Sequence, residues 1–239
     1  MLLGIDTSGA VSVAVARGEL TGPAPEILQV RADERSRHHD EVLLSLIDEV
    51  LTAAGVERSE LTGIVVGRGP GPFTGLRVGL VSARSIAAVL GVPLYGLSSL
   101  DGLAHQALAG LGSAQEGPAH EGAFTVGVAL DARRREVYHA RYRRGVSGEV
   151  TRIADPAVDA PAAVADELTA CDILVGSGTG IYPELLPATA ELVHVDAGHL
   201  LLAAAALSAR GEDLSSTEPM YLREPDAAKP TARKSALGR

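Results

Sequence analysis

The chain has 239 residues, of which 46% are hydrophobic and 21% are charged, enough for one sizeable core or two modest ones. Its net charge of −9 disfavours extensive wrapping around a phosphate backbone, because such binding needs many lysines and arginines. Cys171 is the single cysteine, which excludes an internal disulfide framework and favours a reducing compartment. The apolar N-terminus carries no basic leader or cleavage site, so we expect a cytoplasmic protein with no membrane partner.

The chain opens with the pattern of a β-hairpin. Residues 2–5 predict a strand, residues 6–9 a polar turn, and the alternating valines over residues 11–15 the returning strand. The same pattern recurs over residues 126–142, with Asp131 at the corresponding turn. This repetition predicts two lobes of related topology, each opened by a hairpin whose turn faces a common cleft. The alternative is a coincidence between two ordinary hairpins.

Elsewhere strand and helix signals alternate, as they do in α/β folds. We expect helices at residues 39–54, 73–90, 100–109, 162–169 and 200–210, and strands at residues 63–66 and 172–176. The predicted division is a first lobe over residues 1–103, a second lobe over residues 104–224 and a disordered tail over residues 225–239. A linker between the lobes is expected within residues 110–122.

The most specific stretch is GRGPGPFTGLRVGL, residues 67–80. Its first glycines permit tight backbone conformations, and Pro72 suits the first turn of a helix. Gly75, Gly79 and Ala83 then recur every four residues, which predicts a smooth stripe that another backbone can approach closely. A glycine loop before a helix is also a common anion cradle, but the GK[ST] ending of a Walker A loop is missing.

The helix that contains residues 42–54 has an unusually broad apolar face. Its apolar positions cover roughly 200° of the helical wheel, about twice what a one-sided surface helix needs. One side can serve the core and the other a partner, although a helix enclosed by its own domain would show the same pattern. We expect a partner interface on this helix and on the 73–90 helix, formed by Val42, Leu46, Val50, Leu76, Gly79 and Leu80.

Together these segments resemble the TsaB (YeaZ) family, nearly over the whole chain and in the expected order. The resemblance rests on GIDTS at residues 4–8, the helix opened by His39, the 67–80 stretch, ALDARRREVYHARY at residues 129–142, VGSGTG at residues 175–180 and EPMYLR at residues 218–223. It implies an α/β fold of the actin-like, sugar-kinase-like (ASKHA) class. It also implies that the interface of the family is built from the two helices of the first lobe.

The resemblance further implies a non-catalytic dimerisation subunit. Its partner would be a TsaD-like catalytic subunit, which it activates for transfer of threonylcarbamoyl to N6 of adenosine 37 in tRNA. A TsaE-like ATPase would join the complex, tRNA would be a partner indirectly, and ATP or ADP would belong to the assembled complex rather than to this chain. A homodimer is expected when the partner is absent.

The catalytic relatives of this family hold a metal with two histidines four residues apart in an HxxGH-type turn. The matching positions here are Ser99 and Leu103, and a leucine cannot coordinate a cation. We therefore expect no catalytic and no metal-binding residues. The alternative function is a stand-alone enzyme of the same fold, either a small-molecule kinase or a metallopeptidase.

Two turns are candidates for nucleotide binding. Asp6, Thr7 and Ser8 lie where actin-like enzymes place a phosphate hairpin, and Gly176 and Gly178 would let a backbone approach a ligand closely. The alternative is turn chemistry alone, since neither loop carries a cationic phosphate clamp.

A cluster of arginines carries a separate prediction. Arg133, Arg134, Arg135 and Arg141 lie in or near the second turn, and the returning strand alternates basic with aromatic or small residues. We expect this ribbon to contact tRNA phosphate or an acidic partner face. The alternative is a solvated edge strand protected by its charge.

Overall fold

The structure is a computed structural model that describes residues 1–34, 39–110, 124–145 and 148–223. The predicted linker after Gly110 and the predicted tail over residues 225–239 lie outside these residues.

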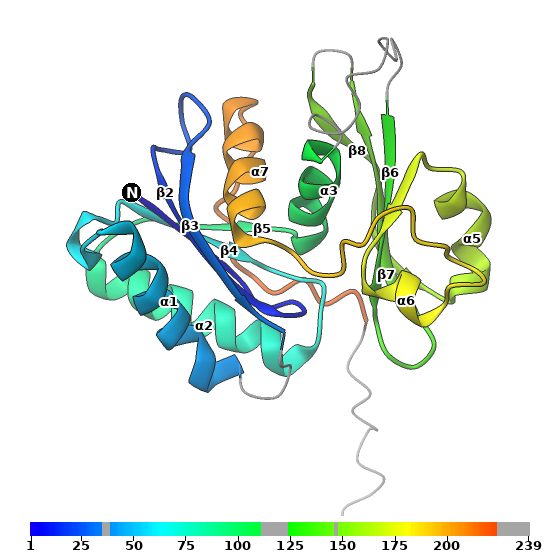
Figure 1. The fold of residues 1–239 in the computed structure, drawn as a ribbon, viewed down its shortest axis with the longest axis horizontal. Helices are drawn as coiled ribbons and strands as arrows, with labels where there is room; N and C mark the ends of the chain where they lie inside the picture. Colours follow the sequence, from blue (N-terminus) through cyan, green and yellow to red (C-terminus); the bar gives the residue numbers. More distant parts are fainter. Residues whose placement is uncertain (35–38, 111–123, 146–147, 224–239) are drawn as a thin grey trace, which may run out of the picture.

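Five strands form the first sheet, in the order β3-β2-β1-β4-β5 (Figure 1). The hairpin strands β1 (Leu2–Asp6) and β2 (Val11–Arg17) pair antiparallel, and β4 (Gly63–Gly67) pairs parallel with β1. The edges are β3 (Glu26–Asp33) and β5 (Leu94–Leu97). Every residue of β1 and β4 is buried, because helices cover both faces of the sheet.

Four strands form the second sheet, in the order β8-β7-β6-β9. Here β6 (Phe124–Asp131) and β7 (Val137–Arg144) form the antiparallel hairpin, and β9 (Ile173–Val175) pairs parallel with β6. The edge strand β8 (Val150–Asp159) lies beside β7. These pairings repeat those around β1, so the predicted two-lobed α/β architecture with a hairpin opening each lobe is confirmed.

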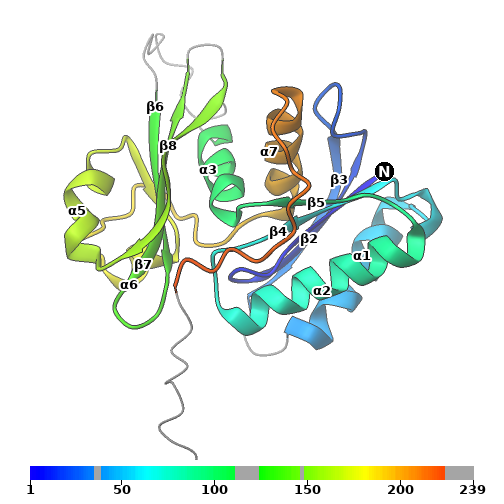
Figure 2. The same cartoon turned by 180° about the vertical axis from the view of Figure 1, so that it is seen from behind.

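Two helices cover the outer face of the first sheet. α1 (His39–Ala54) and α2 (Phe73–Leu90) begin and end where the sequence predicts. Gly91 terminates α2 with a φ of 67°, the left-handed conformation that favours glycine. The two helices lie side by side beneath the sheet in both views (Figures 1 and 2), and their inward side chains join those of β1, β2 and β4 in one core.

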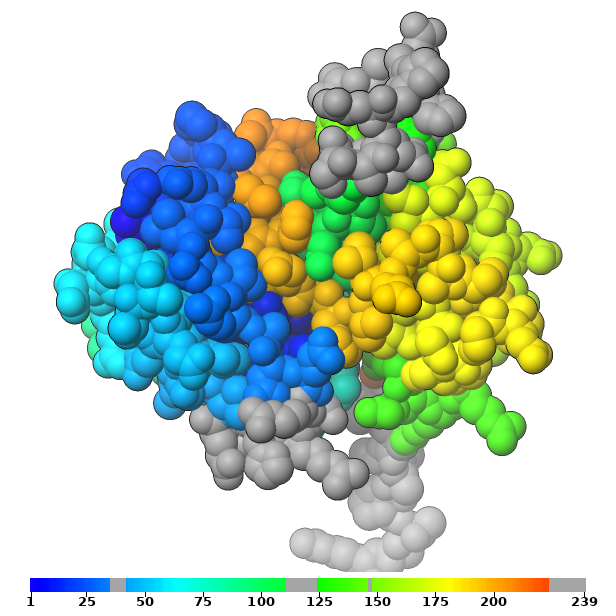
Figure 3. Space-filling view, viewed as in Figure 1, coloured from blue at the N-terminus to red at the C-terminus, as the bar shows by residue number. Residues whose placement is uncertain are grey.

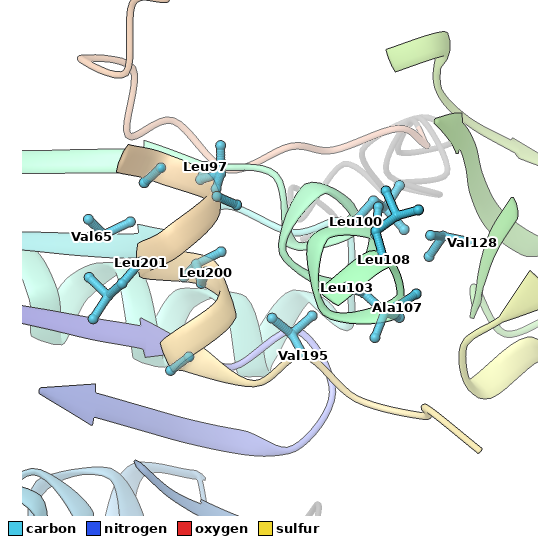
Figure 4. Close-up of a cluster of buried hydrophobic side chains, with 14 of the residues drawn as sticks. Val65, Leu97, Leu100, Leu103, Ala107, Leu108, Val128, Val195, Leu200 and Leu201 are labelled. Carbon is cyan, nitrogen blue, oxygen red and sulfur yellow. The ribbon is translucent and has the colours of Figure 1, made fainter. Parts of the chain in front are cut away.

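Two more helices fill the space between the sheets, as the space-filling view shows for the orange α7 (Figure 3). α3 (Ser99–Ala109) packs on α7 (Ala197–Ala209) and on β6, while α7 packs on β1 and β2. In Figure 4, Leu200 and Leu201 of α7 lie toward Val65 of the first sheet, and Leu108 of α3 lies toward Val128 of the second.

The predicted lobe boundary after residue 103 lies among the helices that fill the space between the sheets. It falls inside α3, and it assigns α7 to the second lobe although this helix covers the first sheet. The physical reason is that a sheet with buried strands needs helices on both faces, and the second face of the first sheet is covered by a helix from late in the chain.

The smaller elements complete the second lobe and join it to the first. α5 (Pro161–Thr169) and α6 (Ser177–Ile181) contact β6 and β9, and the short helix η1 (Arg58–Glu60) follows α1. Residues 212–223, hereafter the C-terminal segment, cross the back of the molecule from one lobe to the other (Figure 2). Arg84 of α2 donates to the carbonyl of Thr217 in this segment (2.8 Å).

Among the described residues, α2 alone is long and apolar enough to cross a membrane by length and composition. It packs on the first sheet with buried residues at every turn, and its arginines bind the C-terminal segment. These contacts are those of a helix in a folded domain.

Candidate functional site

The first hairpin turn is a closed network of hydrogen bonds. One carboxylate oxygen of Asp6 accepts from the amide (2.9 Å) and the hydroxyl (2.6 Å) of Ser8, and the other accepts from the hydroxyl of Ser99 (2.6 Å). Thr7 donates to the carbonyl of Gly75 at 2.9 Å. Asp6, Thr7 and Ser8 are 1%, 0% and 5% exposed. Burial raises the pKa of Asp6, although the hydrogen bonds from Ser8 and Ser99 oppose that shift.

Glycines of the 67–80 stretch pack directly against this turn. A Cβ atom at Gly71 would lie 2.5 Å from the carbonyl oxygen of Ser8, and one at Gly67 or Gly79 would overlap Asp6 or Thr7. The glycine stripe does accommodate a close neighbour, but at Gly79 that neighbour is the side chain of Thr7 in the hairpin of the same chain. Gly79 is therefore buried within its own lobe.

The second hairpin turn differs because its side chains face solvent. Glu136 donates its amide to the carbonyl of Arg133 at 3.0 Å, which closes the turn. Arg133, Arg134 and Arg135 are all exposed. Arg141 lies elsewhere, on β7, where it forms an ion pair with Glu167 of α5 at 2.8 Å. The structure thus brings three of the four predicted arginines together and separates the fourth.

The glycines of the VGSGTG turn are explained by packing. Gly176 has a φ of 112°, and a Cβ atom there would overlap the carbonyl oxygen of Ala129 on β6. A Cβ atom at Gly178 would lie 2.9 Å from a side-chain carbon of Val137 and 3.0 Å from the same carbonyl oxygen. Both glycines allow α6 to sit against the second hairpin. Nucleotide binding at this turn and at Asp6, Thr7 and Ser8 stays a prediction, and the burial of the first turn argues against it.

Four of the six residues predicted for the partner interface have their apolar side chains in the core. Leu46 is 7% exposed, and Val50, Leu76 and Leu80 are covered as fully or more so. Only Val42 is partly exposed. These side chains leave little surface for a partner, because the lobe itself covers them.

Other residues of the same two helices are exposed. Leu44 of α1 is 58% exposed, and Val81 and Val89 of α2 are 60% and 84% exposed. Between the helices lies a groove of about 360 Å³. Its lining is mostly aliphatic: Leu44, Ile47, Asp48, Leu51, Arg58, Leu61, Ser85, Ile86, Val89 and Leu90. We call this surface the α1/α2 groove.

A second, more polar cavity of about 410 Å³ lies between the lobes. There the hydroxyl of Tyr142 donates to Asp101 at 2.7 Å, and Arg152 binds both oxygens of the same carboxylate at 2.7 and 2.8 Å. Burial, followed by the Asp101 charge, raises the pKa of Tyr142 well above its ordinary value. The sequence did not predict this network because its members lie on α3, β7 and β8.

Comparison with known proteins decides the family. The family model for TsaD, tRNA N6-adenosine threonylcarbamoyltransferase, matches residues 30–178. The solved structure of YeaZ from Pseudomonas aeruginosa is 32% identical, covers 92% of this chain and 99% of that chain, and has a TM-score of 0.73. The chain belongs to the TsaB/YeaZ branch of the TsaD family. The expected actin-like fold is confirmed with it.

Curated relatives agree with this placement. The chain is 29% identical over 198 residues to Escherichia coli TsaB, a tRNA threonylcarbamoyladenosine biosynthesis protein, with 78% of this chain and 81% of that protein covered. It is 37% identical over 166 residues to an uncharacterized protein of Mycobacterium tuberculosis, with 68% of this chain covered. The match spans 66% of that relative, just under two thirds of its length.

In this TsaB/YeaZ-family chain, the positions that match the metal-binding histidines of catalytic relatives have structural roles. Ser99 hydrogen-bonds to Asp6, and Leu103 is completely buried in the core between the lobes. His105 and His199 do meet, with their Nδ1 atoms 3.2 Å apart across α3 and α7. Burial and the neighbouring His199 and Arg144 lower the pKa of His105 to about 4. Within the described residues, no group of three or more His, Cys, Asp or Glu side chains could hold a metal.

Proposed function

We propose that this chain is the non-catalytic scaffold subunit of a tRNA N6-threonylcarbamoyladenosine transferase complex. It pairs with a TsaD-like catalytic subunit, activates it, and works in the cytoplasm. Two of its curated relatives are named tRNA threonylcarbamoyladenosine biosynthesis protein TsaB, and others are named tRNA N6-adenosine threonylcarbamoyltransferase. A TsaE-like ATPase joins the assembled complex, and tRNA is bound mainly through the catalytic partner.

The observation that carries this proposal is the α1/α2 groove. An exposed aliphatic patch on two adjacent helices is costly in water and typical of a protein interface. The hydrophobic rim formed by Leu44 and Val89 can enter the core of such an interface, where desolvated anchors contribute most of the affinity. When the catalytic partner is absent, the same groove serves for self-association.

A scaffold role also fits the chemistry of the hairpin turns. The carboxylate of Asp6 is bound by hydroxyl and amide donors of its own chain. Ser99 and Leu103, the residues at the positions of the metal-binding histidines of catalytic relatives, are both buried. Their role is to pack the first hairpin and the α3 helix, and we assign the transfer reaction to the partner subunit.

The test is to mix this chain with its catalytic relative and to measure assembly by sedimentation velocity. Val89→Glu and Leu44→Glu place charges in the α1/α2 groove at exposed positions, so we expect at least about tenfold weaker assembly, a loss of about 1.4 kcal/mol. The urea midpoint of the monomer should not change, because surface substitutions rarely affect folding.

Ile153→Glu is the matched control, since this residue is 42% exposed on β8 of the second lobe. It should assemble like the wild type. Unimpaired assembly of both groove variants would place the interface elsewhere. Turnover of ATP by the isolated chain, or a tightly held metal ion, would instead support a stand-alone enzyme.

A further inference from the structure

The polar cavity between the lobes, hereafter the inter-lobe cavity, is walled by several elements at once. Asp101 of α3, residues 150–152 of β8 and Leu207 of α7 line it, together with Leu214 of the C-terminal segment. Figure 2 shows this segment crossing α7 on its way to the second lobe. The volume of about 410 Å³ is in the range of small-molecule sites. The residues predicted to bind nucleotide, all of which the structure describes, lie outside this lining.

Arg68, which directly follows β4, brings a positive charge to the wall of the cavity. Its Nη1 atom donates to the hydroxyl of Ser216 at 2.9 Å and to the carbonyl of Glu218 at 3.4 Å, and both acceptors are neutral. The carboxylate of Glu218 pairs instead with Arg84 at 2.8 Å. Among the described residues, none pairs a carboxylate with Arg68 and none accepts from its buried Nε atom. Because a buried donor without an acceptor is costly, this guanidinium favours an anion as its ligand.

The surrounding chain holds Arg68 in this position. Gly96 of β5 leaves room for its side chain, because a Cβ atom there would lie 2.6 Å from the Cδ atom of Arg68. The amide of Gly96 donates to the carbonyl of Leu214 at 2.9 Å, and the amide of Met220 donates to the carbonyl of Arg68 at 2.8 Å. The side chain of Arg68 thus lies between an edge strand and the C-terminal segment. A guanidinium that is already ordered loses less entropy when it binds an oxyanion.

The acidic residues of the wall do not offset the charge of Arg68. Asp101 accepts from Tyr142 and binds Arg152 through both of its oxygens, so its charge is already compensated. Glu212 and Asp213 also line the cavity but are exposed. Water and salt screen exposed carboxylates more strongly than they screen a partly buried guanidinium.

Aliphatic side chains form another part of the lining. Leu97, Ala203 and Leu214 line the cavity and are only 3%, 5% and 9% exposed. A second guanidinium, that of Arg210, donates to the neutral carbonyl of Val150 at 2.7 Å. The cavity therefore combines uncompensated basic groups with an apolar wall, which suits a ligand that has one charged end.

We propose that the inter-lobe cavity binds a small molecule with an oxyanion at one end and an aliphatic body. The carboxylate or phosphate of this ligand contacts Arg68, and its body lies against Leu97, Ala203 and Leu207. The planar donor fork of arginine suits both kinds of oxyanion. Because the ligand contacts both lobes, its binding also stabilises the folded chain. This inference does not depend on the proposed function, since the cavity shares no residue with the α1/α2 groove.

The experiment titrates the full-length chain with hexanoate, hexyl phosphate, hexanol and hexylamine, which share an aliphatic body and differ in the head group. Binding is followed by the methyl NMR signals of Leu97 and Val150, which line the cavity, and by the midpoint of thermal unfolding. We expect saturable shifts and a higher midpoint with hexanoate or hexyl phosphate, and neither with hexanol or hexylamine at the same concentration. The anion that binds more tightly identifies the preferred head group.

Two variants test the position of the ligand. Arg68→Gln removes the charge, so the affinity for the better anion should fall at least about tenfold. Ala206→Phe adds bulk at an exposed position of α7 that lines the cavity, so it should block binding while Arg68 stays in place. Arg17→Gln removes an arginine from an exposed ion pair with Glu26 outside the cavity, and it should bind the probe like the wild type.

Thermal unfolding without probe shows whether each variant is folded. If Arg68→Gln unfolds, Ala206→Phe still tests the site, because it removes no contact. Equal binding of hexanol or hexylamine would overturn the inference, since the cavity would then not select an anion. So would failure of both anions to bind the wild type, or binding that is unchanged in the folded variants.

Discussion

The two hairpin turns occupy equivalent places in their lobes but differ in burial and in charge. The first turn, at Asp6, is buried and bonded to α2 and α3 of its own lobe. The second turn, at Arg133, Arg134 and Arg135, is exposed, and Asp131 and Arg223 form hydrogen bonds at its base. The same topology thus contains a buried, hydrogen-bonded turn in the first lobe and an exposed, arginine-rich turn in the second. The comparison shows that two turns with the same place in a repeated topology can have different side chains and different roles.

The largest expected effect on stability is at Gly71, because the first turn leaves no space there for a side chain. Gly71→Ala would place a methyl group 2.5 Å from the carbonyl oxygen of Ser8 and 2.9 Å from its Cα atom. Because backbone cannot give way cheaply, we expect a loss of about 3 kcal/mol in the free energy of unfolding, measured by urea denaturation.

Gly180→Ala is the control near the second hairpin. A Cβ atom there meets nothing within 4 Å, and alanine is the better helix former in α6, so stability should be unchanged or higher by up to about 1 kcal/mol. Equal stability of the Gly71 and Gly180 variants would mean that the first turn is less tightly packed than the structure shows.

Substitutions in the second turn, unlike Gly71→Ala, should raise the free energy of unfolding. Replacing Arg134 by Asn and Arg135 by Gly relieves two positive φ angles, and each unfavourable residue costs about 1–2 kcal/mol. We expect the double variant to raise the free energy of unfolding by about 2 kcal/mol. Destabilisation would show that contacts of the two arginines contribute to folding, which would weaken the contrast between the turns.

The smallest expected effect on stability is the pH dependence that the buried carboxyl group of Asp6 contributes. Its pKa is raised by burial above the ordinary value of 3.8, so the folded state holds this proton more tightly than the unfolded state does. The contribution of Asp6 to stability therefore increases as the pH falls from neutral through the folded pKa, and decreases as the pH rises.

Asp6→Asn should remove this part of the pH dependence. Its side-chain oxygen can still accept from Ser8, so at pH 7 the variant should stay within about 1 kcal/mol of the wild type. The measurement is the difference in urea midpoint between the two proteins from pH 8 down to pH 4, near the ordinary pKa of 3.8. A constant difference over that range would show that Asp6 does not titrate differently on folding.

Local periodicity predicts much of the fold, but only where the pattern is strong. The hairpin strands, α1 and α2 have clear apolar repeats and lie where expected. β8 was missed because Pro156 argues against a strand, yet an edge strand tolerates proline. β3 lacks a regular alternation, and β5 is only four residues long. Packing between distant segments, such as α7 on the first sheet, leaves no local signal.

The site was predicted less well for a related physical reason. Spacing shows that Gly79 accommodates a close neighbour, but it does not show that this neighbour is Thr7. A broad apolar arc on α1 likewise does not separate Leu46, which is buried, from Leu44, which is exposed. Leu46→Asp, which the sequence alone would suggest as an interface variant, should unfold the lobe instead. Burial has to be known before a helix face can be assigned to a partner.

The position of α7 has a consequence for synthesis of the protein on the ribosome. The strands of the first sheet emerge early, but the helix that covers one of their faces begins only at Ala197. A nascent chain must carry this apolar face uncovered until most of its length has been translated, and such surfaces are prone to aggregate. Chaperone contact during translation should therefore concentrate on the first lobe and end once residue 209 has left the exit tunnel.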